Sequence, residues 1–314
     1  MALYSAALGA RILRRWDIRS GSELQLSLER RTYLVSTVLA YALGFQLASL
    51  FLLVYTADAI CSFFVGAMCA AGTFNVNGYG YPALALKTAN FLLAGVWLIL
   101  NHADNRAEDY PLVRRKYALL MVLAPLLLLE TALLWGFFLG LRADVITSCC
   151  GSLFTAGAKG VVSELVGLPV RPMKIAFYLV TAATLIAGFR FRRSGKGGYL
   201  FAALAGGELL VSLLALVSFI SLYIYQLPTH HCPFCILQRE YGYIGYPLYL
   251  SLLLGAVGGL GTGALMPFRD VPSLRAAVPA VQRALTTASL AGYLVFAAVA
   301  TAYQLFTVFR LEGY

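Results

Sequence analysis

Two cysteines separated by two residues, Cys232 and Cys235, are the part of the sequence best suited to chemistry. They stand between two long apolar runs, so the spacing predicts that the pair lies where the chain leaves one membrane helix and enters the next. The open N–H groups and the dipole of a helix N-terminus stabilise a thiolate, which is the reactive form of cysteine. His230 and His231 could add positive charge, and Arg239 would share a helical face with Cys235.

The composition predicts the elements that must hold this pair. The chain has 314 residues, of which 60% are hydrophobic and 12% charged, whereas a soluble domain carries about 25% charged residues. A membrane span needs roughly 20 apolar residues. The sequence therefore predicts an all-α, polytopic membrane bundle with about seven transmembrane helices, at about 33–56, 82–101, 117–141, 173–189, 199–225, 244–266 and 284–309. The fourth is the shortest, and the glycines from Gly255 to Gly263 predict close helix packing in the sixth.

The distribution of basic residues predicts the topology. Most of the 24 Lys and Arg residues lie in residues 1–32 and in every second connecting segment after that. The positive-inside rule then puts the N-terminus in the cytoplasm and the C-terminus outside. It also accounts for the net charge of +10, so no nucleic-acid partner is predicted. Residues 1–16 mix apolar side chains with arginines, which is typical of a helix at the membrane surface; a frayed basic tail is the alternative.

This topology divides the chain into an N-terminal segment (1–32), the bundle (33–309) and an outer tail (310–314). All six cysteines fall in its three outer loops, 58–81, 142–172 and 226–243. Disulfides persist on that side of the membrane, so the cysteines are either a redox relay or structural disulfides. The first loop has no Lys or Arg and could fold back as a partly buried cap. A Gly/Ala/Val stretch in the second could form a short interfacial helix.

The adjacent residues Cys149 and Cys150 leave three interpretations open. They could form a vicinal disulfide and join a redox relay, they could pair with separate partners, or they could bind a soft metal. No dedicated metal site is predicted from them. Six cysteines allow 15 pairings, and the sequence does not choose among these.

Glu130 and Glu208 lie within predicted spans. A carboxylate in lipid costs at least about 2.5 kcal/mol, so such groups usually face a bundle interior and often mark proton paths. A proton relay and a structural carboxyl bonded to a neighbouring helix are both open. Lys87 is near the outer end of its span, where its side chain could extend to the membrane surface. His102, His230 and His231 lie at span ends, so no haem is predicted.

Cys232-Pro-Phe-Cys235 is followed by Gln238-Arg239 and then by Tyr246-Pro247 at the start of an apolar run. These residues resemble the disulfide-bond formation protein B family. Proteins of that family pass electrons from periplasmic dithiols to a membrane quinone in the prokaryotic cytoplasmic membrane. The resemblance implies that Cys232 and Cys235 are the pair next to the quinone, with Arg239 and Gln238 near its head group.

In the first outer loop, Cys61 and Cys69 are followed by residues 77–82 and an apolar run. This pattern is similar to the corresponding loop of the vitamin K epoxide reductases. The resemblance implies that Cys61 and Cys69 shuttle electrons to the Cys-x-x-Cys. Both families have a four-helix core, whereas about seven spans are predicted here, and Cys149-Cys150 belongs to neither pattern.

The sequence thus predicts a multi-pass membrane thiol–disulfide oxidoreductase that exchanges electrons between an outer-face dithiol protein and a quinone. A non-enzymatic membrane subunit with structural disulfides, packed against other subunits, is the first alternative. A soft-metal carrier is the second.

Overall fold

The computed structural model describes residues 2–18, 20–147 and 169–311, and these residues contain helices and no strand. Seven of the described helical segments are long and apolar enough to cross a membrane, which confirms the predicted number of spans and indicates a multi-pass membrane protein. They are α2 (Glu23–Ala59), α4 (Gly80–Asp104), α5 (Val113–Leu139), α7 (Val170–Ser194), α8 (Gly198–Ala215) with its continuation α9 (Ser221–Tyr225), α10 (Gly245–Ala264) and α11 (Ala277–Phe306).

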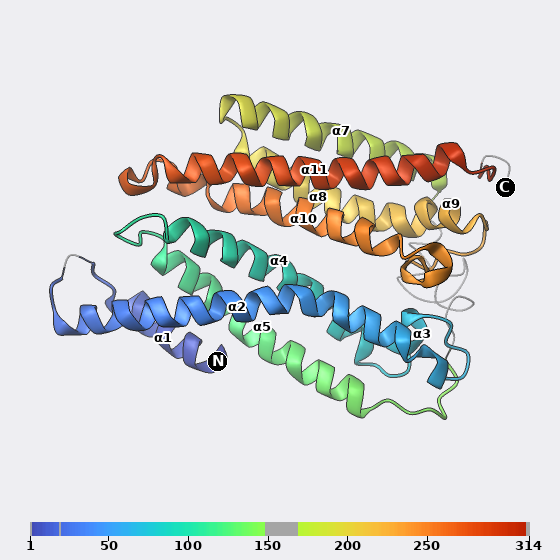
Figure 1. Cartoon of the computed structure of the whole chain (residues 1–314), viewed down its shortest axis with the longest axis horizontal. Helices are drawn as coiled ribbons and strands as arrows, with labels where there is room; N and C mark the ends of the chain where they lie inside the picture. Colours follow the sequence, from blue (N-terminus) through green and yellow to red (C-terminus); the bar gives the residue numbers. More distant parts are fainter. Residues whose placement is uncertain (1, 19, 148–168, 312–314) are drawn as a thin grey trace.

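The long helices form two groups (Figure 1). One contains α2, α4 and α5, and the other contains α7, α8, α10 and α11; α10 packs on α4 and joins them. Small residues let α10 approach its neighbours, as predicted for the Gly255–Gly263 stretch. A Cβ atom at Gly258 would lie 2.8 Å from the carbonyl oxygen of Leu285, and one at Gly261 would clash with a methyl group of Ile99.

The prediction that the fourth span is the shortest is wrong. Helix α7 has 25 residues and ends at Ser194, where Gly195 takes a left-handed conformation with φ of 68°. The helix is longer than the apolar run, because Arg192 and Arg193 form its last turn. Cations in the last turn interact favourably with the negative end of the helix dipole.

The N-terminal residues form helix α1 (Ala2–Arg15), so the interpretation as a frayed tail is wrong. Leu8, Ile12 and Trp16 are buried in one cluster with residues of α2, α4 and α5. A Cβ atom at Gly9 would meet the ring of Tyr117 at 3.3 Å, which shows how closely α1 lies on α5. The apolar face of α1 is therefore covered by the other helices, whereas a helix at the membrane surface would bury this face in lipid.

The loops that carry the described cysteines meet at one end of the molecule. Figure 1 shows α3 (Ala70–Phe74) and α9 at the same end, opposite the turn between α1 and α2. All five residues of α3 are buried. The 58–81 segment thus folds back onto the bundle as a cap, as its composition predicts.

Candidate functional site

Three cysteines from two distant loops form a compact cluster. The Sγ atoms of Cys69, Cys232 and Cys235 all lie within 4.8 Å of one another, and those of Cys69 and Cys232 are 3.6 Å apart. Cys69 and Cys232 are 0% exposed and Cys235 is 4% exposed. No two described cysteines are joined by a disulfide. The fold therefore brings together three of the six predicted cysteines as thiols.

Cys69 is placed by the cap. It precedes α3, and its carbonyl oxygen accepts hydrogen bonds from the N–H groups of Gly72 and Thr73. The Thr73 hydroxyl donates to the carbonyl oxygen of Ala57 on α2 at 2.7 Å. Asp58, at the end of α2, accepts a hydrogen bond from the N–H of Ala70 at 3.1 Å. The start of α3, directly after the cysteine, is thus anchored to α2 at two points.

The Cys-x-x-Cys is held from two helices. The Tyr225 hydroxyl of α9 donates to the carbonyl oxygen of Cys232. From α10, the Tyr249 hydroxyl donates to the carbonyl oxygen of Pro233 at 2.8 Å. The backbone at Cys232 and Pro233 is therefore fixed by one buried and one half-buried phenol.

His231 attaches the same loop to α8. A π-helical turn, Leu216–Ile220, joins α8 to α9, and the carbonyl oxygen of Val217 accepts a hydrogen bond from His231 Nδ1 at 2.9 Å. Burial lowers the pKa of His231, and His230 acts in the same direction, while the bond to Val217 opposes them. His231 therefore favours the neutral form, contrary to the expectation that it adds positive charge beside the thiols.

The expected helix start at the Cys-x-x-Cys is not there. Helix α10 begins at Gly245, ten residues after Cys235, so no long helix directs its dipole at the pair as predicted. Cys235–Leu237 and Arg239–Tyr241 are separate 3-10 turns, interrupted by Gln238 in an extended conformation. Gly242 and Tyr243, with φ of 63° and 57°, then prevent a helix from continuing. Arg239 is exposed and shares no helical face with Cys235.

Gln238 ties the two loops together. Its Nε2 donates to Asp58 Oδ1 at 3.1 Å and to the carbonyl oxygen of Met68 at 2.7 Å. The quinone head group was expected near Gln238 and Arg239, but neither residue lines the apolar cavity that lies beside the cluster. Sequence reasoning missed Asp58, which binds both the α3 N-terminus and Gln238. Its signal is an acidic residue at the end of a long apolar run.

An apolar cavity of about 250 Å³ adjoins the Cys-x-x-Cys. Pro233 and Phe234, the two residues between the cysteines, form part of its wall. Leu237, in the turn that starts at Cys235, is another lining residue. The remaining lining residues come from α2, α4, α8 with its π-helical turn, and α10, among them Leu84, Leu213 and Tyr246. A cavity of about 150 Å³ with an apolar lining holds a benzene ring, so this one has room for a substituted ring.

The other predicted cysteines lie elsewhere. Cys61 is in a short 3-10 turn, is partly exposed and is not a member of the cluster. Cys149 and Cys150, and the expected interfacial helix, fall in 148–168, outside the described residues. The described start of the 142–172 loop nevertheless contacts the 58–81 loop, because the Thr147 hydroxyl donates to the carbonyl oxygen of Gly72 at 3.0 Å.

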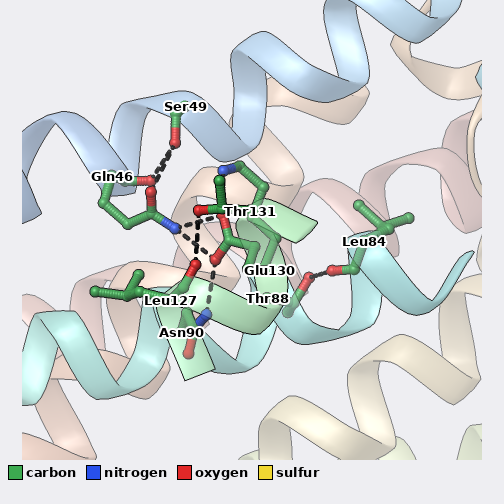
Figure 2. A network of polar contacts seen from close by, with 9 residues as sticks. Gln46, Ser49, Leu84, Thr88, Asn90, Leu127, Glu130 and Thr131 are labelled. Carbon is green, nitrogen blue, oxygen red and sulfur yellow. Dashed lines mark hydrogen bonds and ion pairs between the residues drawn. The ribbon is translucent and has the colours of Figure 1, made fainter. Parts of the chain in front are cut away.

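Glu130 lies in a buried polar network between three helices (Figure 2). Gln46 Nε2 on α2 donates to both carboxylate oxygens, at 2.8 and 2.7 Å, and Asn90 Nδ2 on α4 donates to Oε2 at 2.7 Å. Lys87 Nζ forms an ion pair with Oε1 at 2.7 Å, and its side chain is only 4% exposed. The expectation that Lys87 extends to the membrane surface is therefore wrong. Glu130 has the geometry of a structural carboxylate that links helices.

Glu208 has a different environment. It is 0% exposed, and its Oε1 accepts hydrogen bonds from Thr181 Oγ1 at 2.7 Å and Ser212 Oγ at 3.3 Å. Its Oε2 has no hydrogen-bond partner among the described residues. The ion pairs found in the described part of the chain are Lys87–Glu130 and Lys116–Asp104, so Glu208 is not neutralised by a cation there. Of the two predicted relay residues, Glu208 is the less fully bonded.

Comparisons with known proteins leave the family open: no protein-family model, curated protein or solved structure matches this chain.

Proposed function

We propose that this protein is a membrane thiol–disulfide oxidoreductase that transfers electrons between dithiols on one face of the membrane and a quinone. The observation that supports this most is the 3.6 Å separation of Cys69 Sγ and Cys232 Sγ, one thiol from each predicted cysteine pair. Disulfide exchange requires a thiolate to reach a sulfur of the disulfide that it attacks. The cluster satisfies that requirement with a short movement.

The proposed transfer proceeds by disulfide exchange. A partner dithiol reduces the Cys61–Cys69 disulfide and is itself oxidised. The Cys69 thiolate then attacks Cys232 Sγ of the Cys232–Cys235 disulfide, and Cys235 leaves as a thiolate. Cys61 next attacks Cys69, which releases Cys232. The resulting Cys232/Cys235 dithiol gives two electrons and two protons to the quinone, which becomes a quinol and restores the disulfide.

The apolar cavity is the proposed quinone site. It is lined mainly by apolar side chains and touches Pro233 and Phe234 inside the Cys-x-x-Cys. Tyr246 and Tyr249 add two aromatic rings to its wall, and ligand pockets commonly combine an apolar lining with few polar groups. These residues replace Arg239 and Gln238 as the proposed quinone contacts. Glu208 is the carboxyl proposed to take part in proton transfer.

The proposed orientation places the cysteine cluster on the outer face of a prokaryotic cytoplasmic membrane, with the N-terminus inside. It rests on the positive-inside distribution of Lys and Arg. The electron donor on that face is proposed to be a thiol protein, and the direction of transfer reverses if the partner is a disulfide protein.

The decisive experiment is quinone reduction by a small dithiol in purified protein. Wild-type protein should catalyse it, and Cys232→Ser and Cys235→Ser should not. Cys61→Ser and Cys69→Ser should keep it, because a small dithiol reduces the Cys-x-x-Cys directly, but should lose the reaction with a protein dithiol. Absence of activity in the wild type, or full activity in Cys235→Ser, would reject this proposal and favour the interpretation as a structural subunit.

A soft-metal site is the second candidate, because three thiols converge. Trigonal coordination with metal–sulfur bonds of about 2.3 Å places sulfur atoms about 4 Å apart. The sulfur atoms here lie within 4.8 Å of one another. Reduced protein should then bind one equivalent of Cu(I), and Cys69→Ser should abolish this. Metal binding without any quinone reduction would favour the carrier.

A further inference from the structure

The end of the molecule opposite the cysteine cluster carries a basic hollow between α1 and α2. Its volume is about 480 Å³. Four arginines line it: Arg11, Arg14 and Arg15 from α1, and Arg31 from α2. No acidic residue is part of its wall. The two helices thus direct four positive charges at one concave surface.

Helical periodicity explains the convergence. Arg11, Arg14 and Arg15 are spaced three and four residues apart, so they share one face of α1, while the buried Leu8 and Ile12 occupy another. On α2, Leu24, Ser27 and Arg31 also recur at this spacing and form the facing wall. Like charges at such spacings repel one another, so the cluster carries an electrostatic cost.

The protein itself does not compensate these charges. None of the four arginines forms an ion pair or a hydrogen bond with another described residue. Other arginines differ: Arg114 donates to the carbonyl oxygen of Trp16, and Arg269 to that of Gly195. The positive-inside rule explains why arginines occur at this end, but not why four of them surround one hollow without a partner.

We propose that this hollow binds the anionic head group of a phospholipid, with more than one phosphate as the best match to four guanidinium groups. Guanidinium binds phosphate oxygens through two parallel hydrogen bonds, and basic pockets between helices on the cytoplasmic side are suited to such head groups. Apolar side chains flank the arginines: Leu24, in the wall, is 50% exposed, and Leu13 is 36% exposed. They favour a lipid, which brings acyl chains, over a free phosphate ion. The proposal is independent of the cysteine chemistry.

The test measures lipid binding by delipidated, purified protein with native mass spectrometry. Tetraoleoyl cardiolipin should bind about tenfold or more tightly than dioleoylphosphatidylcholine, since each basic residue near an anionic surface is worth about 1 kcal/mol. Arg14→Gln/Arg31→Gln should lose that preference, and so should Arg11→Gln/Arg15→Gln. The matched control is Arg30→Gln, an exposed arginine beside Arg31 that does not line the hollow and should keep the preference.

Three results would overturn the proposal. The first is equal binding of both lipids to the wild type. The second is an equal loss in Arg30→Gln, which would indicate general charge attraction. The third is stabilisation of the wild type by inorganic phosphate alone to the same melting temperature as by cardiolipin, which would indicate a site for free phosphate. Variant folding is checked by the melting temperature without lipid, which should not fall because removing like charges relieves repulsion.

Discussion

The Sγ atoms of Cys69 and Cys232 lie 3.6 Å apart although 163 positions separate them in the chain. A disulfide requires about 2.05 Å between its sulfur atoms, so a movement of about 1.5 Å would join them. The contact depends on two loops that are each anchored to the bundle, since α2 holds the first and the second is held by α9, α10 and the π-helical turn after α8.

This contact predicts a trapped crosslink. In Cys61→Ser/Cys235→Ser, neither resolving thiol remains, so mild oxidation should yield a Cys69–Cys232 disulfide in most molecules. Peptide mapping by mass spectrometry without reduction detects it. The triple variant that also carries Cys69→Ser is the control and should lack the product. A link from Cys232 to Cys149 or Cys150 in the double variant would contradict the relay order.

Gln238 should matter for transfer between the loops and not for quinone use. Gln238→Leu removes the hydrogen bonds to Asp58 and to the Met68 carbonyl, so the loops should separate more often. Oxidation of a protein dithiol should slow by about tenfold, as expected for roughly 1.4 kcal/mol, while oxidation of a small dithiol stays unchanged. The neighbouring Arg239→Ala is the matched control and should retain both rates. Slower oxidation of both donors by Gln238→Leu would instead indicate a damaged quinone site.

The number of spans and the cap could be predicted from the sequence, because both depend on local composition. Twenty apolar residues in a row have few alternatives to a membrane helix, and a loop without cations can return to the bundle. The geometry of the Cys-x-x-Cys could not be predicted from local pattern. The Arg239 hypothesis assumed a helix from Cys235 onwards, whereas Gly242 and Tyr243 at positive φ interrupt the chain before α10.

The partners of the buried charges could not be predicted from the sequence either. Lys87 is near the N-terminal end of α4, which suggests an extended side chain, but Glu130 on α5 lies opposite it and attracts it inward. Such pairing depends on how α4 and α5 are rotated against each other, and one sequence does not specify that rotation. The role of Asp58 in joining the two loops depends likewise on Gln238, which is 180 positions away in the chain.

The Glu130 network should be a stability element. Glu130→Gln leaves Lys87 charged and buried without its counter-ion, so the free energy of unfolding should fall by about 3–5 kcal/mol. Denaturation in detergent micelles measures this. Adding Lys87→Met to Glu130→Gln should restore a large part of the loss, because no charge then remains in this network. Glu208→Gln is the comparison: no described cation faces Glu208, so this variant should lose far less.

His231 should make stability sensitive to acid. Its pKa in the folded protein is lowered, mainly by burial, below the unfolded value of about 6.5. Between those two values the unfolded chain binds more protons, so the free energy of unfolding increases with pH in that window. Lowering the pH from about 7.5 to about 5.5 should therefore destabilise the wild type. His231→Gln, which keeps an N–H donor for Val217, should show a flatter pH profile; an unchanged profile would assign the sensitivity to another group.

The cavity beside the Cys-x-x-Cys should be the site of quinone use. Leu213 lines it from the α8 segment, so Leu213→Trp should fill part of its volume of about 250 Å³. Quinone-dependent turnover should fall by about tenfold or more, which corresponds to about 1.4 kcal/mol of lost binding. The rate at which a small dithiol reduces the cysteines in the absence of quinone should not change, because the thiols lie outside the substituted wall. Leu210→Trp is the matched control: it introduces the same side chain on the same helix at a position that is 63% exposed, and it should behave like the wild type. If both variants lose activity equally, general disturbance of α8 explains the loss, and the quinone must be sought at another surface of the bundle.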